Sequence, residues 1–97
     1  MAVTFRIPGP LRPLVGGQHT VRLESNPATA GDALDALWGL HPELRHRILT
    51  ERGELRPHVN VFVGAESIRY TGGLATPLAG EAEVAIIPAV SGGIVMG

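Results

Sequence analysis

Four short segments of the chain alternate apolar and polar residues, and only one long stretch has apolar residues at helical spacing. The alternating segments are residues 2–7, 19–24, 58–63 and 83–88. A period of two predicts strands with one buried face, so these segments are expected to form a sheet. A weaker strand is expected at residues 66–70. A single helix covering one face of this sheet gives a two-layer α+β domain.

The helical stretch begins after Asn26 and Pro27. Thr29 is expected to cap the helix, with Asp32 three positions later as in a capping box. One apolar stripe follows at spacings of three and four residues, formed by Ala30, Leu34, Leu37 and Trp38. Gly39 and Pro42 are expected to close the helix.

Glycine and proline mark the connections between these elements. The Pro-Gly-Pro run at residues 8–10 is expected to end the first strand. A shorter helical piece is expected after Pro42, with Leu44 and Ile48 facing inward. In the loop-like segment 71–82, Leu74 and Leu78 are expected to fill the edge of the core.

The composition restricts the class of protein. Cysteine is absent from the 97 residues, which excludes disulfides, thiolate metal sites and thiol catalysis. A net charge of −1 predicts neither nucleic acid nor an anionic membrane as a partner. All 8 basic residues are arginines, so no lysine side chain can accept an isopeptide linkage. Without a signal-peptide pattern or an apolar run near ~20 residues, a cytoplasmic location is expected.

The polar residues form no pattern that requires catalysis or a metal. The histidines are expected to be exposed and to bind no metal; they are His19, His41, His46 and His58. Asp32 and Asp35 are ordinary carboxylates at a helix start. A run of arginines after the helix is interspersed with glutamates and predicts a solvated mixed surface; the arginines are Arg45, Arg47, Arg52 and Arg56. No nucleophile with an adjacent base is evident, so an enzyme is not expected.

The sequence after the last strand reads PAVSGGIVMG, residues 88–97. Gly92 and Gly93 lack a Cβ and tolerate unusual backbone angles, so this pair can enter a narrow channel. Residues 89–93, when extended, reach roughly 16–18 Å beyond the strand. Ala89, Val90 and Ser91 would span the distance from the globular body to the glycines.

Several segments, taken in order, carry a resemblance to a known family. They are VNVFV at 59–63, the Leu74 to Leu78 segment, EVAIIPAV at 83–90, Gly92-Gly93, and the capped helix with His41-Pro42. Together they resemble the ubiquitin-like β-grasp sulfur carriers of the MoaD/ThiS family. The resemblance covers nearly the whole chain and implies a mixed sheet of four to five strands packed on one main helix, with residues 1–93 as the carrier domain.

The resemblance also implies a function. In such carriers a partner enzyme uses ATP to adenylate the terminal glycine carboxylate, and sulfur then replaces AMP to give a thiocarboxylate. Carried over to this sequence, the reactive group is the carboxylate of Gly93. The chain itself would bind no cofactor, because ATP belongs to the adenylating partner, and its other partners would be sulfur donor and acceptor enzymes.

This sequence departs from the family pattern after Gly93. Residues 94–97 block the Gly93 carboxylate as a peptide, so we expect them to be a removable tag. Cleavage is expected between Gly93 and Ile94, by a partner such as a zinc metalloprotease of the deubiquitinase-like kind. Two alternatives are that the tag is an extra edge strand or packing element, and that Gly97 is itself the reactive terminus.

Phe62 and Ile87 point opposite to Val61 and Ile86 on their strands. One of these two sets is therefore expected on the sheet face without the helix. Phe62 and Ile87 are the candidates for docking a partner there; a covering loop or a dimer contact is the alternative. Two other functions remain open: a ubiquitin-like modifier conjugated to proteins through Gly93, and an accessory subunit whose glycine is never activated. The sequence does not indicate which sulfur-requiring pathway is served.

Overall fold

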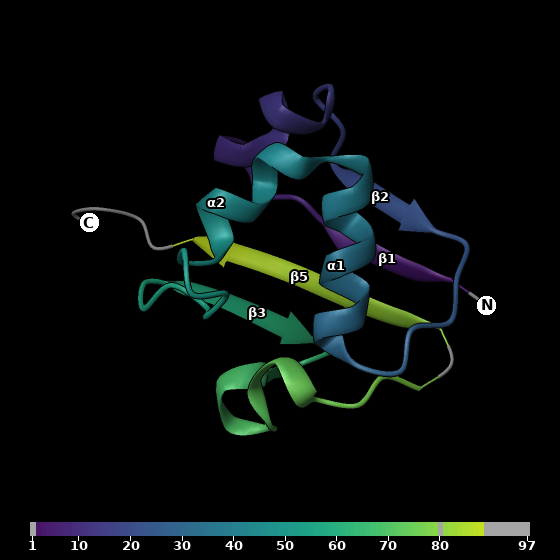
Figure 1. Ribbon diagram of the computed structural model, residues 1–97. Helices are drawn as coiled ribbons and strands as arrows, with labels where there is room; N and C mark the ends of the chain where they lie inside the picture. The colour runs from purple at the N-terminus through teal and green to yellow at the C-terminus, as the bar shows by residue number, and fades with distance from the viewer. Residues whose placement is uncertain (1, 80, 89–97) are drawn as a thin grey trace.

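The fold, seen in a computed structural model, is described for residues 2–79 and 81–88 (Figure 1). The strands are β1 (Val3–Arg6), β2 (Thr20–Leu23), β3 (Val59–Val63), β4 (Glu66–Ser67) and β5 (Ala82–Pro88). The α-helices are α1 (Ala30–Leu40) and α2 (Arg45–Ile48). The 3-10 helices are η1 (Gly9–Val15), η2 (Pro42–Leu44), η3 (Ile68–Tyr70) and η4 (Gly73–Ala75).

The strands form one mixed five-stranded sheet in the order β2-β1-β5-β3-β4. β1 pairs antiparallel with β2, from Val3 opposite Leu23 to Arg6 opposite Thr20. The last strand, β5, lies between β1 and β3, parallel to the first and antiparallel to the second. The predicted α+β class and mixed sheet are confirmed, and the end of the described chain lies at the centre of the sheet.

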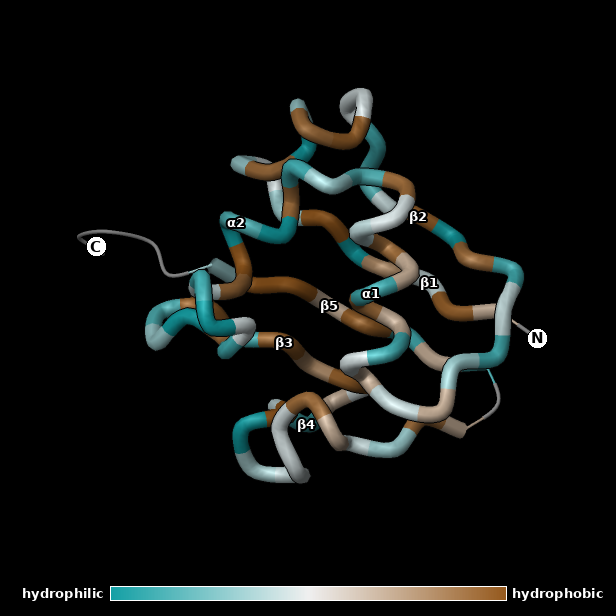
Figure 2. Tube along the Cα trace, viewed as in Figure 1, coloured by the Kyte–Doolittle hydropathy of each residue, from teal (hydrophilic) through white to brown (hydrophobic). Residues whose placement is uncertain are grey.

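Both α-helices lie on the same side of the sheet, and the strands beneath them carry mostly apolar residues (Figures 1 and 2). The predicted cap is present, because the Thr29 hydroxyl accepts a hydrogen bond of 3.1 Å from the Asp32 amide. The predicted apolar stripe of α1 is fully buried. The helix continues through Gly39 and ends at Leu40, with His41 as its C-cap. Leu44 and Ile48 are buried as expected.

The predicted strand at 66–70 is wrong beyond its second residue. Only Glu66 and Ser67 pair with β3, and η3 follows. The Ser67 hydroxyl accepts a hydrogen bond of 3.3 Å from the Arg69 amide, which turns the chain out of the sheet. As a result Ile68 is fully buried while Tyr70 is 88% exposed, although a strand would place both on one face.

The connection between β1 and β2 contains a helix that the proline and glycine pattern did not predict. η1 buries Leu11 and Val15, although Pro13 lies inside it. It ends at Gly16, whose φ of 68° is a left-handed conformation that glycine adopts without strain. This connection therefore contributes to the core.

The remaining predicted edge residues occupy the expected places. Leu74 and Leu78 are partly buried and pack against the central cluster. Gly72 and Gly73 both have positive φ, as a turn requires. No helix within residues 2–79 and 81–88 has the length and apolarity needed to cross a membrane.

Candidate functional site

The carboxyl end of β5 is the part of the fold from which the predicted tail continues. Pro88, the last residue described, pairs with Val59 of β3. The pairing with β1 stops at Arg6 and Ala85, so, among the described residues, 86–88 have a strand neighbour on only one side. Outside the described residues lie the predicted tail, reactive and cleavage positions, Ala89, Val90, Ser91, Gly92, Gly93 and Ile94.

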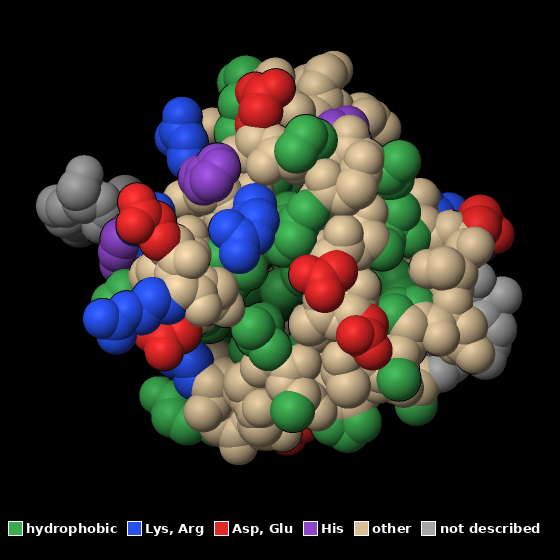
Figure 3. All heavy atoms as spheres, viewed as in Figure 1, with side chains coloured by type: hydrophobic (Ala, Val, Ile, Leu, Met, Phe, Trp, Pro, Cys, Tyr) green, Lys and Arg blue, Asp and Glu red, His purple; other side chains and the backbone are tan. Residues whose placement is uncertain are grey.

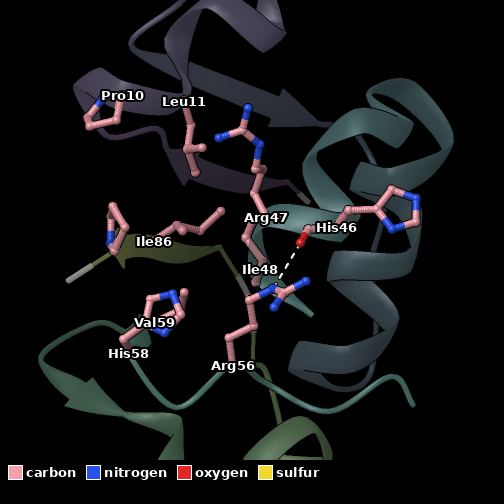
Figure 4. Close-up of a pocket in the computed structure, with 10 residues that line it drawn as sticks. Pro10, Leu11, His46, Arg47, Ile48, Arg56, His58, Val59 and Ile86 are labelled. Atoms are coloured by element: carbon pink, nitrogen blue, oxygen red, sulfur yellow. Dashed lines mark hydrogen bonds between the residues drawn. The ribbon is translucent and has the colours of Figure 1, made fainter. Parts of the chain in front are cut away.

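A pocket of about 380 Å³ lies beside Pro88 (Figure 4). Its floor consists of buried apolar side chains from four elements, Leu11, Ile48, Val59 and Ile86. Basic residues of α2 and of the loop before β3 surround this floor, namely His46, Arg47, Arg56 and His58. The pocket therefore combines an apolar base with basic edges, next to the base of the tail.

The loop after α2 is fastened to that helix by Arg56. Its Nε donates a hydrogen bond of 2.9 Å to the carbonyl oxygen of His46, and its backbone amide donates one of 3.0 Å to the carbonyl of Ile48. The His46 ring points away from the pocket in Figure 4, so its carbonyl rather than its imidazole contributes here. We therefore define the basic rim as Arg47, Arg56 and His58.

Arg69 of η3 positions the segment that carries the basic rim. Its Nη2 donates to the carbonyl oxygens of Arg56, Pro57 and Val59, and its Nε donates to Asn60 Oδ1 at 3.2 Å. One guanidinium thus binds the carbonyls of three residues before and after His58, and it fixes the path of the loop into β3. Nothing in the sequence pattern singles out this arginine, because three of its four acceptors are backbone carbonyls.

A second, smaller depression of about 280 Å³ lies on the other side of β5. It contains Ile87 together with three basic residues, Arg6, Arg12 and His19. Arg12 Nε donates a hydrogen bond of 3.0 Å to the carbonyl of Ile7, and Arg6 pairs with Glu83 at 3.7 Å. Among the described residues, no carboxylate lines either this depression or the pocket beside Pro88.

The other ion pairs of the described residues lie away from both depressions, on exposed side chains. Arg22 pairs with Glu24 and, at 3.7 Å, with Glu81. The hydrogen bond between Arg22 and Glu24 raises the pKa of Arg22 and lowers the pKa of Glu24. The attraction between their opposite charges adds to both shifts. Within the described part of the chain, Arg47 and Arg56 take part in no ion pair.

The two residues predicted for docking do lie on the sheet face that the helices leave open. Ile87 is opposite Asn60 and is 48% exposed, and Phe62 is opposite Ala85 and half-buried. Val61 and Ile86, which alternate with them, are buried beneath the helices. The open face therefore presents a small apolar area next to Pro88, whereas its β1–β2 half carries charged residues.

The histidines lie mainly at the surface. His19, His46 and His58 are exposed, and His41 is half-buried. In residues 2–79 and 81–88 no group of three or more histidine or acidic side chains is arranged to hold a metal ion.

The arginine run after α1 lies on a surface of mixed charge, as predicted, but its residues line separate depressions. Arg47 and Arg56 line the pocket beside Pro88, while Glu51, Arg52 and Glu54 line a separate depression that shares only Arg56. Figure 3 shows basic side chains over α2 and the following loop with acidic side chains among them, and two further acidic side chains over α1. This arginine run was the only sign of the basic rim in the sequence. Which of its residues line the pocket depends on the fold.

Comparison with known proteins identifies the family. The sequence model described as "ThiS family" matches residues 5–93. The chain belongs to the ThiS family. This confirms the predicted resemblance to the MoaD/ThiS carriers, and the matched range ends at Gly93.

Named relatives of this ThiS-family chain include carriers and modifiers. It is 38% identical over 95 residues to the sulfur carrier protein CysO of Mycobacterium tuberculosis, covering 96% of this chain and all of CysO. It is 48% identical over 80 residues to small archaeal modifier protein 1 of Haloferax volcanii, covering 81% of this chain and 87% of that protein.

Solved structures give the same result for the fold. A chain of the Amycolatopsis orientalis BexX/CysO complex matches with a TM-score of 0.84 and 34% identity, over 94% of this chain and 99% of that one. The predicted ubiquitin-like β-grasp fold is therefore confirmed. This ThiS-family chain is a small ubiquitin-like protein of the sulfur-carrier and modifier class, not an enzyme.

Proposed function

We propose that this protein carries sulfur as a thiocarboxylate on Gly93. The observation that supports this most directly is the family match, which runs from residue 5 through Gly93 and no further. The relative CysO, which this chain matches along that relative's whole length, is named as a sulfur carrier.

The proposed chemistry needs a partner enzyme, because a carboxylate is a poor electrophile. The Gly93 carboxylate attacks the α-phosphorus of ATP on the partner, which forms an acyl adenylate and releases pyrophosphate. A hydrosulfide equivalent from a sulfur donor then attacks the acyl carbon and forms a C–S bond. The bond between the acyl carbon and the phosphate oxygen breaks, and AMP leaves. The product is the thiocarboxylate, whose sulfur passes to an acceptor enzyme. ATP is thus a substrate of the partner.

The geometry of β5 suits this delivery. The strand is paired up to Pro88, and Gly93 is the fifth residue after Pro88. Fully extended, five residues reach roughly 16–18 Å, which is enough for Gly93 to enter an active site while the β-grasp body stays outside. We propose that Phe62 and Ile87 on the open face contact that partner, since Ile87 lies next to Pro88 and Phe62 lies on the same face opposite Ala85.

In this proposal residues 94–97 are removed before activation. They follow the end of the family match, and as long as they remain, Gly93 has a peptide bond in place of a free carboxylate. The cut falls between Gly93 and Ile94 and is made by a partner peptidase, for which we propose a zinc metalloprotease.

Mass spectrometry of the protein isolated from its source organism tests both steps. The expected species ends at Gly93 and gains the mass difference of one sulfur for one oxygen when the pathway is active. A Gly93→Ala variant serves as a control, since it keeps the body and alters only the reactive residue. Isolation of chains that all end at Gly97 under those conditions would contradict the proposal.

A second candidate function is conjugation to other proteins through Gly93. The observation that favours it is the 48% identity to a small archaeal modifier protein. Immunoblots of cell extracts against this protein separate the two functions. Conjugation predicts a ladder of heavier adducts that disappears in the Gly93→Ala variant, whereas sulfur transfer alone predicts the free protein and its thiocarboxylate.

A further inference from the structure

Basic side chains from separate segments surround the base of the tail. The basic rim (Arg47, Arg56 and His58) lies on one side of residues 86–88, and Arg12 and His19 lie on the other. The sequence has 9 acidic and 8 basic residues, so this is a local separation of charge and not an excess over the whole molecule. Among the described residues, no carboxylate lines either depression.

We infer that the basic rim is a docking surface for a carboxylate-rich area at the mouth of the active-site cleft that receives the tail. This inference rests on the proposed function, because it names the chemistry of the partner surface that Gly93 must pass. It concerns a different part of the molecule from the apolar residues Phe62 and Ile87.

The position of Pro88 supports this choice of occupant. Pro88 is itself part of the pocket wall, together with His58 and Ile86. A cleft that encloses the chain from residue 89 onward must therefore meet the basic rim at its mouth.

The charges of the rim are available for this contact. Arg47 has neither an ion pair nor a side-chain hydrogen bond among the described residues, and Arg56 uses its Nε on the His46 carbonyl. A guanidinium has five N–H donors in a planar fork that fits a carboxylate, so both arginines keep donors for a partner. Opposite charges on two such surfaces also accelerate their association by steering.

Nucleic acid is a weaker fit to the same surface. A nucleic-acid site neutralises several phosphates along a path, whereas the basic residues here form a small ring around one strand end in a protein with a net charge of −1. A small free anion is distinguished from a protein carboxylate by the test below.

Nuclear magnetic resonance titration of the full chain with a synthetic oligoglutamate peptide tests the surface directly. We expect shifts at Arg47, Arg56 and His58 that weaken as salt is added, and roughly tenfold weaker binding for Arg47→Glu. Arg52→Glu is the matched control, because it makes the same charge change on a neighbouring residue outside the pocket. His58→Glu provides a second test variant should Arg47→Glu fail to fold. Shifts centred elsewhere, an equal loss in the control, or tighter binding of inorganic phosphate would overturn the inference.

Pyrophosphate release by the adenylating enzyme of the source organism tests the same surface in use. With variants expressed and processed in that organism, Arg47→Glu is expected to raise the half-saturating concentration of the carrier about tenfold without changing the maximal rate. Arg52→Glu should leave both values unchanged. An unchanged half-saturating concentration for Arg47→Glu would overturn the inference. If the proposed chemistry at Gly93 is wrong, the enzyme releases no pyrophosphate even with the unmodified chain. The peptide titration then tests the docking surface by itself.

Discussion

Arg69 is an exposed side chain whose contacts are nevertheless almost all structural. Its guanidinium donates to the backbone carbonyls of Arg56, Pro57 and Val59, which carry the rim segment into β3. This single residue of η3 is therefore hydrogen-bonded to the segment that lines the pocket beside Pro88.

Replacing Arg69 by Ala should therefore loosen the segment 56–59. We expect a loss of about 1 kcal/mol in the free energy of unfolding, measured by urea denaturation, because exposed hydrogen bonds are partly replaced by water. Faster hydrogen exchange at the Val59 amide, which donates to the Arg56 carbonyl, should accompany it. Arg69→Lys keeps the charge but not the planar fork, and it should recover little. An unchanged exchange rate at Val59 in Arg69→Ala would show that the loop holds its path without this side chain.

The Arg22–Glu24 pair predicts a pH effect of known sign. Because Arg22 lowers the pKa of Glu24 in the folded state, the pair stabilises the fold above the unfolded pKa of Glu24. That contribution is lost as pH falls through the lowered folded pKa. Titration of the Glu24 carboxyl by nuclear magnetic resonance should show a higher midpoint in Arg22→Gln than in the unmodified chain. Equal midpoints would mean that the pair does not persist in solution.

At the scale of elements, α1 is held close to η4 at a glycine. A Cβ on Gly31 would lie 3.0 Å from the carbonyl oxygen and 3.2 Å from the Cβ of Leu74. Gly39, in the same helix, has no such neighbour within 4 Å. The two glycines therefore form a matched pair for the same substitution.

We expect Gly31→Ala to destabilise the protein and Gly39→Ala to stabilise it. Alanine is more stable than glycine in a helix interior by about 0.5–1 kcal/mol. Gly39→Ala should raise the free energy of unfolding by up to this amount. At Gly31 the crowding with the Leu74 backbone outweighs the gain, because moving that carbonyl shifts all of η4. Thermal unfolding of the two variants measures the difference. Stabilisation by both substitutions would mean that η4 adjusts freely.

The elements that could be predicted are those whose sequence signals act over a few residues. The Thr29 cap and the buried face of α1 could be predicted, because capping and helical spacing act over a few residues. η1 could not be predicted, since the Pro-Gly-Pro run at residues 8–10 was interpreted as a break, although a proline also suits the first turn of a short helix. The strand predicted at 66–70 was cut short because a Ser67 side-chain hydrogen bond competes with sheet pairing.

At the scale of the whole molecule, the site was predictable only in part. The Gly92-Gly93 pair and the alternation of Phe62 and Ile87 are visible in the sequence, so the tail and the open face could be named. The basic rim could not, because Arg47, Arg56 and His58 meet Pro88 only once the last strand is inserted between the first and third. Neither that strand order nor the parallel pairing of β1 with β5 is encoded in any local pattern.

The proposed docking surface can be tested by comparing an exposed apolar residue on each face of the molecule. Ile87 on the open face and Leu40 at the end of α1 are similarly exposed, at 48% and 57%. We expect Ile87→Thr to weaken binding to the adenylating enzyme about tenfold, while Leu40→Gln has no effect. Isothermal titration calorimetry measures both affinities, and circular dichroism checks that both variants fold. Equal effects of the two substitutions would argue against the open face as the contact.

The placement of β5 also determines how the protein responds to a mechanical load on its end. β5 is hydrogen-bonded to β1 along its first half and to β3 along its second, in the middle of the sheet. A partner that pulls on the chain beyond Pro88 therefore loads these bonds in shear, so that many must break together. A partner enzyme can therefore pull the chain end into its active site and release it again, while the folded domain keeps its structure.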